Sequence, residues 1–228
     1  MKVIKNLSAI AVLGLLLAAK TQAQYAPTHP YQYQYQPYPS GPFYLGVDVG
    51  GAFVQSMKLK NLGSGADLDP GVRADFTFGY EFAPPIAVEF ETGTLWNRFS
   101  DNSPFGQAGI RADLYQVPFL ANFVGHFPVN NTGLSFYAGV GAGGVASELD
   151  LSQENFGFRA HANDTDFTFA YQAKAGVNYE FAPNMAVGLG YKFLGTLDHR
   201  WFEGDPNLYI HSGPSYSHAI LASFTWRF

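Results

Sequence analysis

The stretch Tyr216–Phe228, YSHAILASFTWRF, decides the fold. Counted back from its end, apolar residues occupy every second position: Phe228, Trp226, Phe224, Ala222 and Ile220. A period of two predicts a β-strand with one apolar face. The stretch ends on an aromatic residue with no turn after it. This ending is typical of a strand that closes a membrane barrel and places aromatic side chains at the lipid interface.

Seven further segments upstream show the same alternation, so we expect one domain of eight strands over residues 43–228. The predicted strands are 43–57, 71–82, 86–97, 114–127, 134–147, 167–181, 185–194 and 216–228. Their connections alternate between short (83–85, 128–133 and 182–184) and long (58–70, 98–113, 148–166 and 195–215). Short periplasmic turns and long outer loops are typical of outer-membrane barrels. The sequence therefore predicts an all-β fold, an eight-stranded antiparallel transmembrane barrel with up-and-down topology.

A local repeat supports this register. YEFAPPIAV at 80–88 and YEFAPNMAV at 179–187 occupy equivalent predicted hairpins. Proline and asparagine are frequent in turns, so convergence on good turn chemistry is an alternative explanation.

The first residues predict export. Lys2 and Lys5 precede an apolar run at 9–19, and Thr21-Gln22-Ala23 is a plausible cleavage site, so residues 1–23 are interpreted as a signal peptide. Residues 24–42, rich in Tyr, Gln and Pro, are expected to form an extended periplasmic leader. The chain has no cysteine, which excludes disulfides, thiolate metal sites and cysteine catalysis.

The charged residues indicate which face meets lipid. Without Lys2, Lys5 and Lys20, ten basic and eighteen acidic residues remain, and none lies within the apolar stripes. Turning the polar face outward would place basic side chains in lipid at about 2–4 kcal/mol each near the midplane. We therefore predict a charged interior. An eight-stranded barrel is barely wide enough for its own side chains, so we expect a plugged lumen.

The charges in such a lumen must pair, because unpaired buried charge is costly. The predicted lumen charge network consists of Asp48, Arg73, Asp75, Glu89, Glu91, Lys174, Lys192 and Arg227. As a hypothesis, Glu89 and Glu91 pair across the lumen with Arg73, Lys174, Lys192 or Arg227. Inward glycines in 134–147 would leave room for these long side chains. No cofactor is expected.

Two neighbouring segments carry a family resemblance. YQVPFLANFVGHFP at 115–128, followed by LSFYAGVGAGGVA at 134–146, resembles the central hairpin of the OmpA-like and opacity-type small outer-membrane barrels. The resemblance implies a surface-exposed, non-enzymatic protein of the Gram-negative outer membrane, surrounded by lipid and lipopolysaccharide, that stabilises the envelope and adheres to host or surface ligands through four loops. It also implies that Trp226 and Phe228 are the signal for the barrel assembly machinery.

Four loop aromatics are expected to contact a partner: Phe156, Phe158, Trp201 and Phe202. The alternative is that they fold back over the barrel mouth as a lid. Outside the strands, acidic residues outnumber basic ones by twelve to six, which argues against nucleic acid or another anionic polymer as partner.

Three other interpretations remain open. A divalent metal site would use His161 with Asp164 and Asp166, or His199 with Asp198, Glu203 and His211, although no spacing is diagnostic. A lipid A-modifying enzyme would use His211-Ser212 or Ser217-His218, yet adjacent residues of a strand point to opposite faces. A secreted lipocalin-like carrier of an apolar ligand would turn its apolar faces inward.

Overall fold

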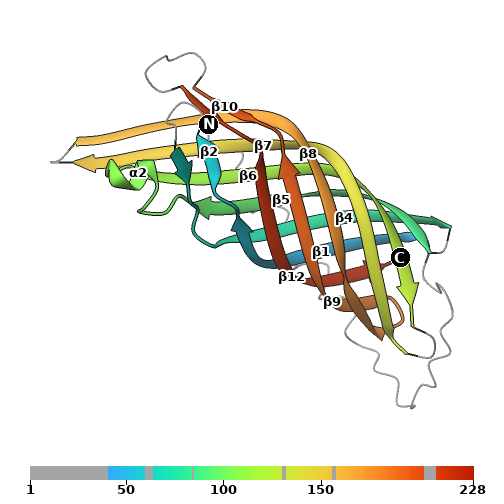
Figure 1. Cartoon of the computed structure of the whole chain (residues 1–228). Helices are drawn as coiled ribbons and strands as arrows, with labels where there is room; N and C mark the ends of the chain where they lie inside the picture. The colour runs from blue at the N-terminus through green and yellow to red at the C-terminus, as the bar shows by residue number, and fades with distance from the viewer. Residues whose placement is uncertain (1–40, 60–63, 84, 130–131, 156–157, 203–208) are drawn as a thin grey trace. The chain divides into compact units, whose positions relative to one another are not determined.

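Eight long strands close into a single barrel. The structure, a computed structural model, describes residues 41–59, 64–83, 85–129, 132–155, 158–202 and 209–228. The barrel strands are β1 (Phe43–Val54), β4 (Gly71–Ala83), β5 (Ile86–Arg98), β6 (Arg111–Pro128), β7 (Leu134–Asn155), β8 (Phe158–Ala182), β9 (Met185–Thr196) and β12 (Ser215–Arg227). Their order is β1-β12-β9-β8-β7-β6-β5-β4, with every pair antiparallel (Figure 1). The predicted fold class is confirmed.

The first and last strands join to complete the barrel. β1 pairs with β12 over eleven positions, from Tyr44 opposite Arg227 to Val54 opposite Ser217. The terminal residue continues this seam, because the amide of Phe228 donates to the carbonyl of Phe43 over 3.0 Å. No helix among the described residues is long and apolar enough to cross a membrane.

The outer wall is apolar, as the alternation predicts. Large side chains on it, such as Phe123 (50% exposed) and Ile220 (56%), face outward, whereas Arg73 and Glu91 (both 0%) face the interior. A lipocalin-like carrier needs the opposite arrangement, with polar residues on the outer wall. That interpretation is therefore wrong.

The glycines on the inward face of β7 allow neighbouring strands and side chains to approach closely. A β-carbon at Gly141 would overlap the amide side chain of Asn122, and one at Gly143 would overlap the carbonyl of Phe119. Replacing either glycine by a larger residue would push β6 away or displace the inward side chain of Asn122.

The two halves of the sequence repeat form the same hairpin. β4 and β5 pair Tyr80 with Val88 and shift register between Glu81 and Ala83. β8 and β9 pair Tyr179 with Val187 and shift between Glu180 and Ala182. An equivalent β-bulge at both turns shows that the repeat is structural.

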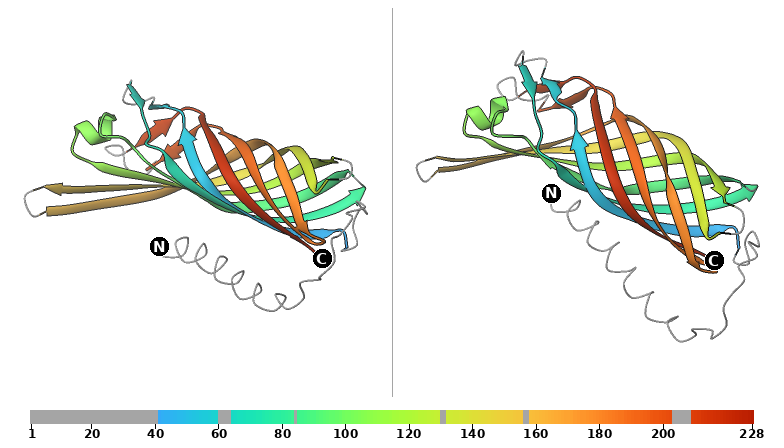
Figure 2. Two further views of the ribbon diagram at one scale, coloured as in Figure 1. Left: turned by 90° about the horizontal axis from the view of Figure 1, so that it is seen from below. Right: turned by 60° about the horizontal axis from the view of Figure 1, so that its bottom comes forward.

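The long connections contain more regular structure than the sequence suggested. β7 and β8 continue far beyond 134–147 and 167–181, so the expected loop 148–166 is mostly a two-stranded hairpin that projects beyond the closed barrel (Figure 2). The other loops contribute a four-stranded sheet with the order β10-β11-β2-β3. These strands are β2 (Met57–Leu59), β3 (Ser64–Ala66), β10 (His199–Trp201) and β11 (Ile210–Ser212). A short helix, α2 (Pro104–Gln107), begins at Ser103, whose side chain caps it.

The small sheet and α2 cover the barrel end that lies opposite the C-terminus (Figure 2). We call this covering the cap. Its buried apolar residues form one cluster with inward residues of the barrel: Ala52, Val54, Met57, Leu59, Ala66, Leu95, Phe99, Phe105, Ala112, Leu114, Leu149, Leu151, Trp201, Ile210, Ala219 and Leu221. The interior is therefore charged toward the periplasmic end and apolar toward the outer end. The expectation of a polar inward face along the whole barrel is wrong for this outer part.

Candidate functional site

Glu91 lies at the centre of the charged interior. Its carboxylate is 3.1 Å from Nη2 of Arg73, 3.1 Å from Nζ of Lys174 and 3.0 Å from Nζ of Lys192. These four residues come from β4, β5, β8 and β9, and each is buried. The alternation of the strands places them on the inward face, and the staggered register brings them to one level of the barrel.

Three more carboxylates complete this cluster. Asp75 lies 2.8 Å from Nε of Arg73 and 2.8 Å from Nζ of Lys192. Asp48 also lies 2.8 Å from Lys192, and Glu89 pairs with Lys174. The cluster thus joins three cations to four anions, so each buried charge has at least one opposite charge beside it.

Two amide side chains connect the ion pairs. Gln172 accepts a hydrogen bond of 2.8 Å from Arg73 Nη2 and donates to Glu91 Oε1 over 3.0 Å and to Asn122 Oδ1 over 3.1 Å. Neither amide was among the predicted network residues. Their inward parity in β6 and β8 was the signal that would have found them, because a polar side chain facing a charged lumen must join its hydrogen bonds.

Arg227 forms an ion pair with a further carboxylate. It lies at the end of β12, and its Nη1 donates to Glu81 over 2.9 Å. Its guanidinium also lies 5.3 Å from the ring centre of Tyr44. Arg227 and Glu81 therefore form a further ion pair, and Arg227 lines the same pocket as Glu89 and Lys174.

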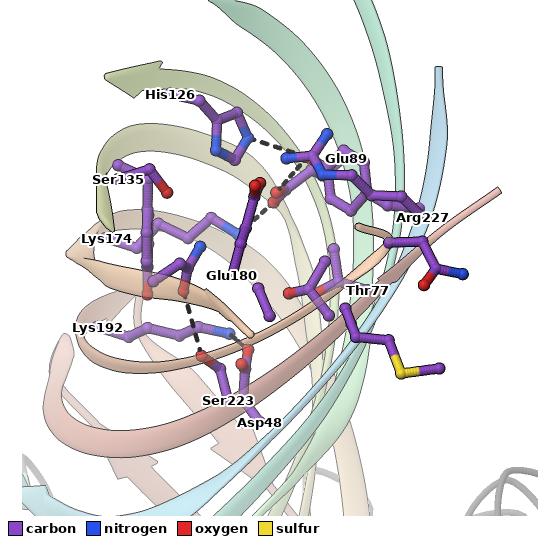
Figure 3. Close-up of a pocket in the computed structure, with 18 residues that line it drawn as sticks. Asp48, Thr77, Glu89, His126, Ser135, Lys174, Glu180, Lys192, Ser223 and Arg227 are labelled. Carbon is purple, nitrogen blue, oxygen red and sulfur yellow. Dashed lines mark hydrogen bonds and ion pairs between the residues drawn. The ribbon is translucent and has the colours of Figure 1, made fainter. Parts of the chain in front are cut away.

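This small pocket opens between the central cluster and Arg227 (Figure 3). Tyr44 donates to Glu89 over 2.7 Å and lies 3.4 Å from Nε2 of His126. The pocket has about 40 Å³ of space, room for roughly three water molecules. Tyr44 was not identified from the sequence, although it shares the inward parity of Asp48. A pocket of this size does not fit an organic substrate.

At the outer end, Trp201 is buried in the cap. It is 1% exposed, stacks on His199 with ring centres 5.0 Å apart, and donates from Nε1 to the carbonyl of Ser147 over 3.1 Å. Phe202 is half-buried against the same apolar cluster, and its backbone adopts a left-handed conformation with φ of 59°. The expectation that Trp201 is an exposed contact is wrong, because its indole is buried in the apolar cluster beneath the cap. Phe156 and the side chain of Phe158 lie outside the described residues.

A hydrogen-bonded chain anchors the cap to the barrel. Nε2 of His199 lies 2.8 Å from the hydroxyl of Thr196, and its Nδ1 lies 3.1 Å from Asp166. Asp166 belongs to the part of β8 beyond the β8–β9 pairing, outside the closed barrel. Burial opposes its ionisation, but hydrogen bonds from His199 and the amide of Arg200 outweigh burial and lower its pKa.

A hydroxyl, an imidazole and a carboxylate in this order are also the parts of a nucleophilic catalytic site. Here Thr196 is 2% exposed and His199 is 0% exposed, so a substrate has no access to the hydroxyl. We interpret the hydrogen bonds among these three side chains as a structural anchor of the cap.

The other serine-histidine pairs do not form a nucleophile and base. Ser217 is buried and faces inward, whereas His218 faces outward and lies 2.6 Å from the hydroxyl of Tyr191. Ser212 donates to the carbonyl of Gly213, and the neighbouring His211 lies 3.3 Å from Asp198.

The proposed metal ligands do not converge in the described part of the chain. No group of three His, Asp or Glu side chains there is placed to hold a metal ion. The side chain of His161 and all of Glu203 lie outside the described residues.

The terminal aromatics lie on the outer wall at the periplasmic end. The rings of Trp226 and Phe228 are 5.2 Å apart, and Phe228 is 6.2 Å from Phe43. Phe228 is 45% exposed. This position is accessible to an assembly factor, and the role itself stays a prediction.

Comparisons with known proteins agree with this architecture. The crystal structure of Neisserial surface protein A matches with a TM-score of 0.53 and 17% identity, over 84% of this chain and all of the other. The attachment invasion locus protein Ail of Yersinia pestis, in complex with a heparin analogue, has a TM-score of 0.44 and 16% identity, over 82% and 99% of the two chains. The outer membrane protease OmpT of Escherichia coli has a TM-score of 0.47 and 10% identity, over 86% and 99%.

The match to Neisserial surface protein A shows a shared fold, and at 17% identity it transfers no activity. No curated protein matches the sequence. The family model described as "Outer membrane protein beta-barrel domain" matches residues 9–228, almost the whole chain. The apolar outer wall, the closed eight-stranded barrel and this match agree, and the chain belongs to the outer membrane protein beta-barrel domain family of the Gram-negative outer membrane.

Proposed function

We propose that this protein is a non-enzymatic surface protein with a closed lumen, which stabilises the outer membrane and presents its outer end to a ligand. The observation that carries the proposal is the filling of the interior. Salt-bridged side chains occupy its periplasmic part and the apolar cluster occupies its outer part. To cross the barrel, a solute would have to break the salt bridges and displace the apolar cluster.

The outer end supports a contact role. The cap is a folded sheet joined to the barrel, and the hairpin of β7 and β8 continues to Asn155 and Phe158 beyond the closed wall. A platform that is already folded loses less conformational entropy on binding a ligand than an unstructured loop does. The excess of acidic residues outside the strand segments predicted from the sequence favours a neutral or cationic ligand over nucleic acid.

A conductance measurement tests the closed lumen. The full chain, purified and inserted into a planar bilayer, is expected to give no steady current at moderate voltage, because ions find no continuous aqueous path. A steady current with a reproducible unit conductance would contradict the closed lumen and indicate a diffusion channel.

An attachment assay tests the contact role. Residues 153–160 are replaced by Asn-Gly, which suits a two-residue hairpin turn between the directly opposed Ser152 and His161. Cells with this variant are expected to attach less to a host-cell or matrix surface than cells with the parent protein. The control is N184G, in a turn at the opposite end. Heat-dependent gel mobility verifies equal amounts of folded barrel, and unchanged attachment would leave the structural role alone.

The role of Trp226 and Phe228 in assembly is tested separately. Exchanging Phe228 for Ser is expected to lower the amount of folded barrel in the membrane while total synthesis is unchanged. An unchanged folded fraction would contradict the role of this aromatic as an assembly signal.

A further inference from the structure

Two aromatic rings mark the upper boundary of the lipid-facing wall on β5 and β6. Trp96 and Tyr115 lie opposite each other in the sheet and stack with ring centres 6.5 Å apart. On the same wall, on the periplasmic side of this pair, lie the exposed rings of Phe90, Phe119 and Phe123. Aromatic side chains are enriched at the headgroup level of membranes, so Trp96 and Tyr115 place the outer interface here.

A cluster of two arginines and one aspartate follows immediately above this pair. Asp113 accepts a hydrogen bond of 3.0 Å from Nε of Arg98 through one oxygen and lies 3.2 Å from Nε of Arg111 through the other. Trp96 also donates to Asp113 over 3.3 Å. We call Arg98, Asp113 and Arg111 the arginine clamp. Arg98 and Asp113 each lie two residues beyond the aromatic pair. Two residues of a strand rise about 7 Å, which is roughly 5 Å along the membrane normal for a strand tilted by about 40°.

The clamp leaves the terminal nitrogens of both guanidinium groups available. Each arginine uses Nε for Asp113, and no partner for their Nη atoms occurs within the described residues. The side chains of Arg98 and Arg111 are 37% and 59% exposed. Arg98 also lies 5.6 Å over the ring of Trp96, which orients its plane. Two held guanidinium groups with free Nη edges match the oxygens of a phosphate.

The acidic neighbours of the clamp do not fill this site. Glu148 is 8% exposed and accepts a hydrogen bond of 3.2 Å from Asn163. Asp150 pairs with Asp113 in the sheet register and has an interaction of its own. Within the clamp itself, two positive charges face one negative charge.

We propose that the arginine clamp binds the phosphorylated headgroup of a lipid in the outer leaflet, with Arg98 and Arg111 as phosphate ligands. The headgroup level fixed by Trp96 and Tyr115 favours a lipid over a soluble anion, because the acyl chains of such a lipid lie against the aromatic wall below. Asp113 is a positioning residue that holds both arginines by their Nε atoms.

The test is a binding titration of the full chain in detergent micelles, followed by native mass spectrometry. The probes are diphosphorylated lipid A and the same lipid A with its phosphates removed. The variant is R98Q/R111Q, and the matched control is K58Q/R200Q, which removes two exposed basic residues from the cap at the same end. A heat-dependent gel shift verifies that all variants are folded.

We expect R98Q/R111Q to bind diphosphorylated lipid A about ten-fold more weakly or worse, because several charged hydrogen bonds are lost. The control should stay within about two-fold of the parent. Parent protein should bind the dephosphorylated lipid as weakly as the variant does. Equal binding by parent and R98Q/R111Q would overturn the proposal. Inorganic phosphate that displaces the lipid at equal concentration would show a free-anion site and overturn the assignment to a lipid.

Discussion

The two parts of the barrel interior are stabilised by different physical means. The periplasmic part contains Arg73, Glu91 and Lys192, which are at most 1% exposed and are stabilised by one another. The outer part contains residues such as Leu114 and Leu149, which are equally buried and pack against the cap. The stability of the charged part depends on the balance of positive and negative charges, because removing one charge leaves others unpaired in a medium of low polarity. The apolar part depends on volume, because a lost side chain leaves a cavity.

Removing a cation from the charged part should have the largest effect. Lys192 lies within 3.0 Å of Asp48, Asp75 and Glu91, so K192M leaves four carboxylates facing two cations. We expect the free energy of unfolding in lipid vesicles to fall by about 3–5 kcal/mol. The measurement is urea-induced unfolding followed by tryptophan fluorescence.

The control variant is E91Q, which removes a negative charge from the same cluster. It leaves three carboxylates and three cations, and each cation keeps at least one partner among Asp48, Asp75 and Glu89. Its loss should therefore be clearly smaller than that of K192M. A larger loss for E91Q would show that the individual contacts of Glu91 matter more than the balance of charge.

In the charged part of the interior, the direction of each side chain could be predicted from the sequence. There, apolar and polar residues alternate strictly, as in VRADFTF at 72–78, so parity identified Arg73, Asp75 and their partners as inward. In the outer part both faces are apolar, as at Leu95-Trp96, and alternation loses its information. Trp201 was mistaken for an exposed residue for a related reason: hydrophobicity marks a buried residue and a contact residue alike.

Pairing between inward residues was less predictable than their direction. The partner of Arg227 depends on strand register, and register depends on the turns and on bulges such as that between Glu81 and Ala83. The long β7–β8 hairpin was missed because Glu148–Asn155 is rich in polar residues, which are typical of loops. β7 nevertheless pairs with β6 as far as Ser152, which lies opposite Arg111, so the sheet continues through these polar residues.

An intermediate effect is expected in the apolar part. Leu114 is 0% exposed and belongs to the cluster beneath the cap. L114A should lower the free energy of unfolding by about 3 kcal/mol through the cavity it creates. L114M, which conserves volume, should cost less than about 1.5 kcal/mol. Equal losses for the two variants would indicate that the cap relaxes around this position and that volume does not stabilise the outer part.

The smallest effect is expected at the contact between Asp166 and the cap. Asp166 binds His199, whose ring stacks on Trp201, so a carboxylate anchors the apolar cap. Because its pKa is lowered in the folded protein, its contribution is fully present above the pKa of the unfolded chain and is lost as pH falls through the folded pKa. At pH 7, D166N should lower the stability of the cap by about 1 kcal/mol.

The fluorescence of Trp201 isolates this local effect when the other two tryptophans are replaced, in a W96F/W226F background. D166N and this parent should differ at pH 7 and converge at a pH below the lowered pKa of Asp166, where the parent carboxyl is also protonated. An equal difference at both pH values would contradict the anchor role of the charge. Asp166 would then hold the cap through hydrogen bonds that its neutral form also makes, and the outer part of the barrel would be closed by packing without an electrostatic contribution.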